Sequence, residues 1–151
     1  MELEDMYREI ILDHYRHPHH AGLREPFDAQ VFNVYGDGYD EVTLRVALSG
    51  ADPEPVVADV SYQALGCSIH QASTSMMTDL VIGKTVSEAM AISEAFFDLM
   101  RSRGTAEPDE DTLDEAIALV GVSKYPARIK CALLGWMAWK EATTQALSLR
   151  G

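Results

Sequence analysis

The stretch Asp40-Glu41-Val42-Thr43-Leu44-Arg45-Val46-Ala47-Leu48 contains the clearest structural pattern in the chain. Apolar residues occupy every second position of 42–48, a pattern that predicts a half-buried β-strand. The next segment, Ser49-Gly50-Ala51-Asp52-Pro53, is typical of a turn, and the apolar segment 56–62 indicates the returning strand. An antiparallel hairpin is therefore the expected centre of the fold.

Segments on both sides of this hairpin complete the predicted fold. Residues 29–34 are apolar and indicate a third strand, and residues 2–16 carry apolar side chains at helical spacing. Downstream helices are expected over 69–81, 85–100 (capped by Thr85 or Ser87), 113–120 and 126–147. The prediction is an α+β fold, a three-stranded antiparallel sheet with helices packed over it, in a single domain over residues 1–151.

Composition and charge exclude several classes of partner. The formal net charge is −12 at pH 7 and the chain lacks Lys/Arg clusters, so neither nucleic acid nor an anionic membrane is an expected partner. No segment approaches the ~18 uninterrupted apolar residues of a membrane span. The acidic start, Met1-Glu2-Leu3-Glu4-Asp5, does not resemble a signal peptide. Two cysteines do not make a disulfide framework, so we expect a protein of the reducing cytoplasm.

The two cysteines, Cys67 and Cys131, each lie where a helix is expected to begin. A helix N-terminus presents unpaired N–H groups and a partial positive charge, and both stabilise a thiolate. Thiolates bind metals and carry out sulfur chemistry. A third segment, Gly36-Asp37-Gly38-Tyr39-Asp40, precedes a strand and has the composition of a site loop. These three segments form the candidate functional site.

Four motifs occur in order along the chain: Asp13-His14-Tyr15-Arg16, Asp40-Glu41-Val42-Thr43-Leu44, Gly66-Cys67-Ser68-Ile69 with Ala72-Ser73-Thr74-Ser75-Met76-Met77, and Ser123-Lys124-Tyr125-Pro126-Ala127-Arg128-Ile129-Lys130-Cys131. Together they resemble the NifU-like, IscU-type family of iron–sulfur cluster assembly proteins. Lys130 and the acidic segment before the last helix make the SufU branch the most similar. The resemblance covers nearly the whole chain.

The resemblance implies a small antiparallel sheet under helices, with a site built from three loops at one end. In SufU-like members three cysteines and one aspartate hold zinc, and Asp40, Cys67 and Cys131 match the aspartate and the last two cysteines. The family's first cysteine falls at Gly38, in a loop that is altered and longer here. That cysteine takes persulfide sulfur from a cysteine desulfurase, the implied protein partner. SufU-like members are zinc-dependent sulfur acceptors, and Gly38 removes the acceptor atom.

The matched residues suit a tetrahedral metal ion. Asp40, Cys67 and Cys131 supply three donors, and two thiolates with a carboxylate suit zinc, or iron and an iron–sulfur cluster. The candidates for a fourth donor are water, His70, Asp37 and Tyr39. His70 lies one turn after Cys67, on the same helix face, although a solvated first-turn histidine is the favoured interpretation.

Three functions fit these observations. The first is an iron–sulfur cluster assembly protein, of scaffold or sulfur-relay type, with a metal or cluster site between three loops. The second is a diverged, non-catalytic zinc-binding partner or regulator of a cysteine desulfurase. The third is a redox or structural protein with a Cys67–Cys131 disulfide, which requires Cα atoms within about 7 Å. We predict the first.

Four histidines, His14, His17, His19 and His20, surround the predicted end of the first helix. Their spacing resembles a metal-binding cluster. Because they straddle the helix end and Pro18, a solvated helix terminus is the favoured interpretation.

Overall fold

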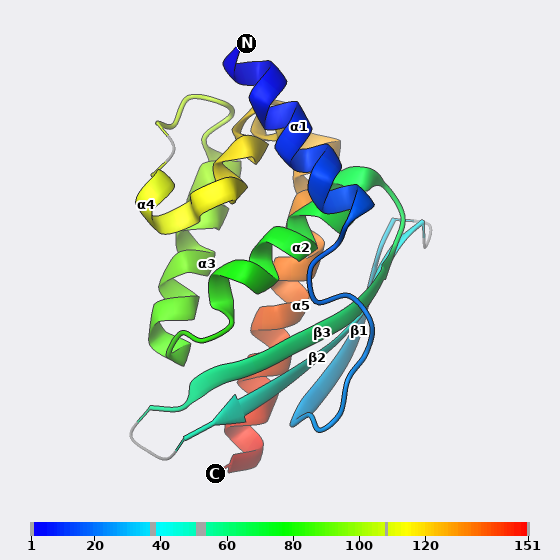
Figure 1. Ribbon diagram of the computed structural model, residues 1–151, viewed down its shortest axis with the longest axis vertical. Coiled ribbons are helices and arrows are strands. Elements are labelled where there is room, and N and C mark those ends of the chain that lie inside the picture. The colour runs from blue at the N-terminus through cyan, green and yellow to red at the C-terminus, as the bar shows by residue number, and fades with distance from the viewer. Residues whose placement is uncertain (1, 37–38, 51–53, 108, 151) are drawn as a thin grey trace.

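The chain forms one helix, then three strands, then a series of helices, in a computed structural model that describes residues 2–36, 39–50, 54–107 and 109–150 (Figure 1). The elements are α1 (Leu3–Arg16), β1 (Ala29–Tyr35), β2 (Asp40–Ser49), β3 (Val56–Leu65), α2 (Ser68–Val81), α3 (Val86–Arg101), α4 (Glu110–Leu113), the 3-10 helix η1 (Asp114–Lys124) and α5 (Pro126–Arg150). The predicted order of elements is confirmed.

The sheet has the order β1-β2-β3, and both pairs of strands are antiparallel. Along β2 the side chains are buried at alternate positions, from Asp40 to Leu48, so one face of the sheet looks toward the core. The prediction of a three-stranded antiparallel sheet under helices is confirmed. The strand itself begins earlier than the apolar alternation, because Asp40 already pairs with Tyr35 of β1.

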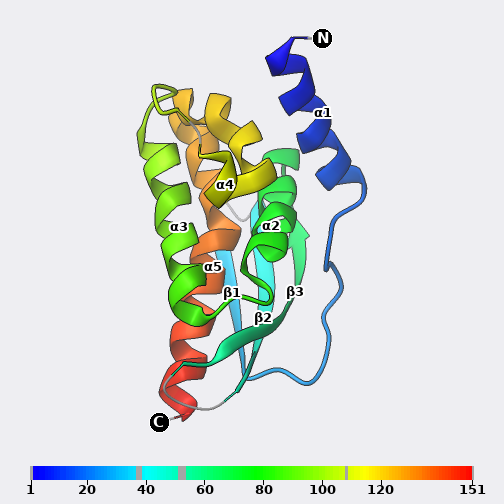
Figure 2. The ribbon, with the colours of Figure 1, turned by 60° about the vertical axis from the view of Figure 1, so that its left-hand side comes forward.

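Helix α5 runs beside the sheet for the length of the molecule and packs against β1, β2 and α2 (Figures 1 and 2). Its two tryptophans, Trp136 and Trp139, are fully buried. Trp136 stacks on Phe96 of α3 with ring centroids 4.3 Å apart, and its indole N–H donates to Ser73 Oγ at 3.0 Å. These contacts fix α5 against α2. Residues in the early part of α5 therefore lie beside residues at the start of α2.

Helix ends follow the local sequence in most places. Thr85 caps α3 in a reciprocal capping box with Glu88, as the sequence predicts for one of two candidate residues. The expected helix through 113–120 is wrong in form. The chain makes α4, then turns at Asp114, whose φ is +44°, and continues as the 3-10 helix η1.

Among the described residues no helix combines the length and the apolarity that a membrane span requires.

Candidate metal centre

The starts of β2 and α2 and the early part of α5 bring Asp40, Cys67 and Cys131 together at one end of the sheet. Asp40 is the first residue of β2, Cys67 is the N-cap of α2, and Cys131 lies in the early part of α5. One carboxylate oxygen and the two sulfur atoms all lie within 4.8 Å of one another. The structure therefore assembles the three residues that the family resemblance selected, from positions far apart in the sequence.

The Asp40 carboxylate is the centre of this group and is only 3% exposed. Its Oδ1 accepts the backbone N–H of Cys67 at 2.8 Å. Its Oδ2 accepts the Cys131 S–H at 2.9 Å and lies 4.0 Å from Cys67 Sγ. One oxygen is thus held by the backbone at the start of α2, and the other faces both sulfurs.

Gly66 allows the Asp40 carboxylate to lie close to the backbone at the start of α2. Its φ is +122°, and a Cβ built on it would lie 2.0 Å from Asp40 Oδ1. Only glycine adopts such a conformation without strain, and only a residue without a side chain leaves room for the carboxylate. No local sequence pattern other than the position of Gly66 directly before Cys67 indicates this role.

The expectation that both cysteines begin a helix is correct for Cys67 and wrong for Cys131. Because α5 starts at Pro126, Cys131 lies inside the helix, and its sulfur is 3.5 Å from the carbonyl oxygen of Ala127. Burial raises the pKa of the Cys131 thiol, and the hydrogen bond to Asp40 raises it further. Without a cation the thiol form is the stable one. The neighbouring Lys130 points its Nζ over the Tyr35 ring, at 5.7 Å.

His70 is buried, so the expectation of a solvated first-turn histidine is wrong. Its Nε2 donates to the carbonyl oxygen of Glu41 at 3.0 Å, and its Nδ1 has no partner among the described residues. Burial lowers the pKa of this imidazole. His70 is not a member of the close group of ligand atoms. Of the other candidate donors, Tyr39 is 72% exposed and Asp37 lies outside the described residues, as does Gly38, the position of the family's first cysteine.

The donor set fits a thiophilic tetrahedral ion. Two thiolates and one carboxylate hold three positions and leave one open, as in reactive zinc sites. The same set also suits iron, because iron–sulfur chemistry uses thiolate ligands in tetrahedral geometry. Removing the Cys131 proton would complete the set, so binding of a cation and deprotonation are coupled.

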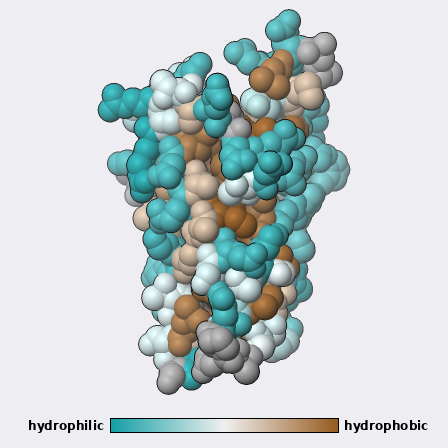
Figure 3. Space-filling model, turned by 90° about the vertical axis from the view of Figure 1, so that its left-hand side faces the viewer, coloured by the Kyte–Doolittle hydropathy of each residue, from teal (hydrophilic) through white to brown (hydrophobic). Residues whose placement is uncertain are grey.

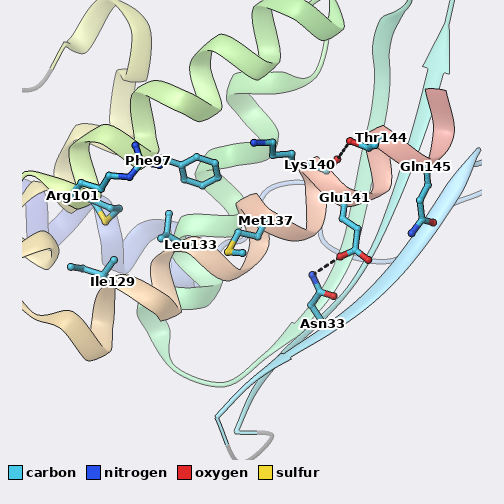
Figure 4. A pocket seen from close by; sticks show the side chains of 11 residues that line it. Asn33, Phe97, Arg101, Ile129, Leu133, Met137, Lys140, Glu141, Thr144 and Gln145 are labelled. Carbon is cyan, nitrogen blue, oxygen red and sulfur yellow. Dashed lines mark hydrogen bonds between the residues drawn. The ribbon is translucent and has the colours of Figure 1, made fainter. Parts of the chain in front are cut away.

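An apolar pocket of about 570 Å³ lies elsewhere, between α3, α5 and β1 (Figure 4). Phe97, Leu133 and Met137 line it, while Lys140 and Glu141 belong to its polar margin. The side of the molecule that carries α3 and α4 also shows apolar surface in a hollow between hydrophilic margins (Figure 3). None of the three candidate ligands lines this pocket.

The prediction of a solvated histidine cluster is wrong for His14 and correct for His17. His14 is 1% exposed, whereas the His17 side chain is 75% exposed and is paired with Asp13. His14 and His19 lie beside Asp79 of α2, with one ligand atom of each within 4.8 Å of the others. No local pattern reveals the role of Asp79, because His19 is 60 positions away in the sequence.

A three-stranded antiparallel sheet under helices, with Asp40, Cys67 and Cys131 gathered at one end, places the chain in a class of small α+β proteins. The family model described as "NifU-like N terminal domain" matches residues 6–132, which include all three candidate ligands. The chain belongs to this family.

Relatives of known name agree with this assignment. The chain is 38% identical over 141 residues to the "iron-sulfur cluster assembly scaffold protein IscU" of Streptococcus pyogenes serotype M1, covering 93% of this chain and 84% of that one. It is 37% identical over 143 residues to the "zinc-dependent sulfurtransferase SufU" of Bacillus subtilis, covering 95% and 92%.

Solved structures agree as well. The N-terminal part of a nitrogen-fixing NifU-like protein from Brucella abortus superposes with a TM-score of 0.76 at 25% identity, covering 97% of both chains. FiSufU from Fervidobacterium islandicum AW-1 superposes with a TM-score of 0.74 at 30% identity, covering 93% of this chain and 98% of that one. The fold predicted from the sequence is thereby confirmed.

Proposed function

We propose that this chain is an iron–sulfur cluster assembly protein of the scaffold or sulfur-relay type, and that Asp40, Cys67 and Cys131 hold its metal or cluster. The observation that carries the proposal is the close group of these three ligand atoms in a chain of the NifU-like family. The scaffold name of the streptococcal relative supports the same function. The alternative of a non-catalytic desulfurase regulator has no observation of its own in its favour.

Zinc is the resident ion that the Bacillus subtilis relative suggests, and iron or a cluster is the cargo that the scaffold relatives suggest. A bound zinc supplies a Lewis acid that keeps both sulfurs as thiolates. The residues of the chain orient the donors. The Cys67 N–H donates a hydrogen bond to Asp40 Oδ1, so Oδ2 is the oxygen available to a cation. The Cys131 S–H now bonded to Oδ2 loses its proton when the site fills.

Sulfur acceptance is the weaker part of the activity in this chain. The family's first cysteine is the acceptor implied by the resemblance, and Gly38 occupies its place. A persulfide would then have to form on Cys67 or Cys131, and both belong to the proposed ligand set. We therefore infer a protein that holds a metal or cluster better than it takes up sulfur.

A cysteine desulfurase is the proposed protein partner, in a reducing cytoplasm. Exposed apolar side chains lie on or next to the segments that carry the proposed ligands: Val34 is 46% exposed, Tyr39 72%, Leu65 55% and Tyr125 56%. A group of such residues beside a functional site is typical of a protein interface. The net charge of −12 favours a partner with a basic surface.

The test is elemental analysis joined to a desulfurase assay. The chain is purified without chelators, and zinc and iron are measured in the wild type and in Cys67→Ser, Cys131→Ser and Asp40→Asn. Each of the three variants is expected to lose metal. Lys130→Ala, beside Cys131 but directed toward Tyr35, is the matched control and is expected to keep it. A wild type without metal, indistinguishable from the three variants, would contradict the proposal.

A further inference from the structure

A second group of metal-binding side chains lies where the end of α1 meets α2. His14 is on α1, His19 and His20 are on the segment that follows it, and Asp79 is on α2. Figure 1 shows this end of α1 beside α2. The group is separate from Asp40, Cys67 and Cys131, and one ligand atom each of His14, His19 and Asp79 lies within 4.8 Å of the others.

His14 has the hydrogen bond to a carboxylate that metal-ligating histidines commonly make. Its Nε2 lies 2.9 Å from Glu115 Oε1, and because a carboxylate only accepts, this nitrogen carries the proton. The lone pair is then on Nδ1, which accepts the Ser75 hydroxyl at 2.8 Å. Histidines that bind metals commonly donate their other N–H to a carboxylate, which fixes the tautomer and the ring orientation.

The segment after α1 brings two more imidazoles to the same place. Ser75 Oγ also accepts the backbone N–H of His19, at 2.8 Å, so the serine joins His14 to His19. The two rings lie with centroids 4.6 Å apart. His19 Nδ1 lies 2.5 Å from Asp79 Oδ2, and His20 Nε2 lies 3.4 Å from Asp79 Oδ1. The Asp79 carboxylate is thus paired with the imidazoles of both His19 and His20.

Burial divides this group into a fixed inner part and an accessible outer part. The His14 side chain is 1% exposed, whereas those of His19, His20 and Asp79 are 40%, 37% and 39% exposed. An ion can therefore reach the outer three residues from solvent, while His14 is held in position by Ser75 and Glu115.

We propose that His14, His19 and Asp79, with His20 as fourth donor, form a second cation site for a divalent transition metal of the zinc, cobalt and nickel class. Imidazole nitrogens with one carboxylate oxygen are donors that these ions prefer, and the set contains no sulfur. His14 binds through Nδ1 after the Ser75 hydroxyl, which now donates to this nitrogen, turns away from it. His19 binds through Nδ1 after its proton moves to Nε2, and Asp79 Oδ2 changes from hydrogen-bond acceptor to ligand.

Such an ion would join the end of α1 to α2. Because the metal binds the folded chain and not the separated ligands, its binding free energy adds to the stability of the fold. The inference does not depend on the proposed function, since none of the four residues belongs to the thiol site. The two sites differ in chemistry, which makes them separable by spectroscopy.

The experiment uses the full chain with the thiol site removed by Cys67→Ser and Cys131→Ser. Cobalt(II) is titrated and its d–d absorption recorded. We expect about one equivalent per chain, without a thiolate charge-transfer band. His19→Ala and Asp79→Asn are each expected to abolish this uptake. Glu115→Gln, which acts on His14 through its hydrogen bond, should weaken it by roughly 10–100-fold. His17→Ala, an exposed histidine of the same segment, is the control and should leave uptake unchanged.

Three results would overturn the proposal: no uptake of cobalt, uptake that His19→Ala and Asp79→Asn both leave unchanged, or uptake that His17→Ala reduces as much as they do. His14→Ala is not used, because the side chain is buried and its loss threatens folding. If the double cysteine variant does not fold, the wild type is loaded with zinc, and the second equivalent of metal is counted in the same series of variants.

Discussion

Gly66 and Asp40 lie in close contact: a Cβ built on Gly66 would lie 2.0 Å from Asp40 Oδ1 and 2.8 Å from Asp40 Cα. The contact lets the backbone at the start of α2 bind the carboxylate, because the N–H of Cys67 then reaches Oδ1 at 2.8 Å. The geometry of the candidate metal centre thus depends on a residue that has no donor atom in its side chain.

Gly66→Ala is expected to displace Asp40 and to reduce metal content together with stability. The backbone strain at a φ of +122° alone costs about 1–3 kcal/mol, and the clash with the carboxylate adds to it. Denaturant unfolding and elemental analysis measure the two effects. Gly83→Ala is the control, since Gly83 also has a positive φ, +87°, but no atom within 4 Å of its Cβ position. Equal metal loss in both variants would refute the role of the contact.

Metal affinity at the thiol site is expected to rise with pH across the neutral and mildly alkaline range. The pKa of Cys131 is raised by burial and by Asp40, so the free chain keeps its proton there and the cation must displace it. Competition with a chromogenic zinc chelator at several pH values measures how steeply the zinc affinity depends on pH. In Cys131→Ser this dependence should become shallower. A zinc affinity of the wild type that does not change with pH would contradict the prediction.

Gly38→Cys is expected to tighten zinc binding and to increase persulfide uptake from a desulfurase. Gly38 lies outside the described residues, and the prediction rests on its match to the family's first cysteine. A third thiolate would supply both a fourth donor and an acceptor sulfur. Zinc competition and radiolabelled sulfur transfer measure the two gains. Tyr39→Cys, one position along the same loop, is the control and should give a smaller gain.

The free energy of unfolding of the metal-free chain is expected to fall as the pH drops below about 6.5. Burial lowers the pKa of His70 from its ordinary 6.5, so the unfolded chain takes up a proton that the folded chain resists. The loss of stability begins near the pKa of His70 in the unfolded chain and continues toward its lower pKa in the folded chain. His70→Gln keeps a donor for the Glu41 carbonyl without titrating, and its stability should depend less on pH in this range. Identical pH profiles would exclude His70 as the cause.

Gly135→Ala is expected to destabilise the fold by about 1–3 kcal/mol, because overpacking forces the two helices apart. A Cβ at Gly135 of α5 would lie 2.2 Å from Thr74 Oγ1 and 2.9 Å from Thr74 Cβ on α2. The midpoint of urea denaturation measures the cost. Gly121→Ala, with no atom within 4 Å of its Cβ position, is the control and should be near neutral. A neutral Gly135→Ala would show that α2 and α5 can separate freely.

Short-range sequence patterns were sufficient for most of the helices and strands; the exception is the segment 113–120, most of which belongs to the 3-10 helix η1. The alternation along 42–48 specified β2 and its buried face, and Thr85, one of two candidate caps, begins α3. Both follow from interactions between residues a few positions apart, which the sequence displays directly. The resemblance of four motifs selected Asp40, Cys67 and Cys131, and the structure places these residues together.

Only the tertiary structure determined what surrounds those residues. The raised pKa of Cys131, the burial of His70 and the contact of Gly66 with Asp40 all depend on how α2, α5 and β2 meet. His14 was expected in solvent and is buried because Ser75 and Glu115, from α2 and η1, close over it. Burial and electrostatics are sums over neighbours in space, and most of these neighbours are distant in the chain. The sequence by itself thus determined most of the elements and the family, while packing between the elements determined the surroundings of both groups of candidate ligands.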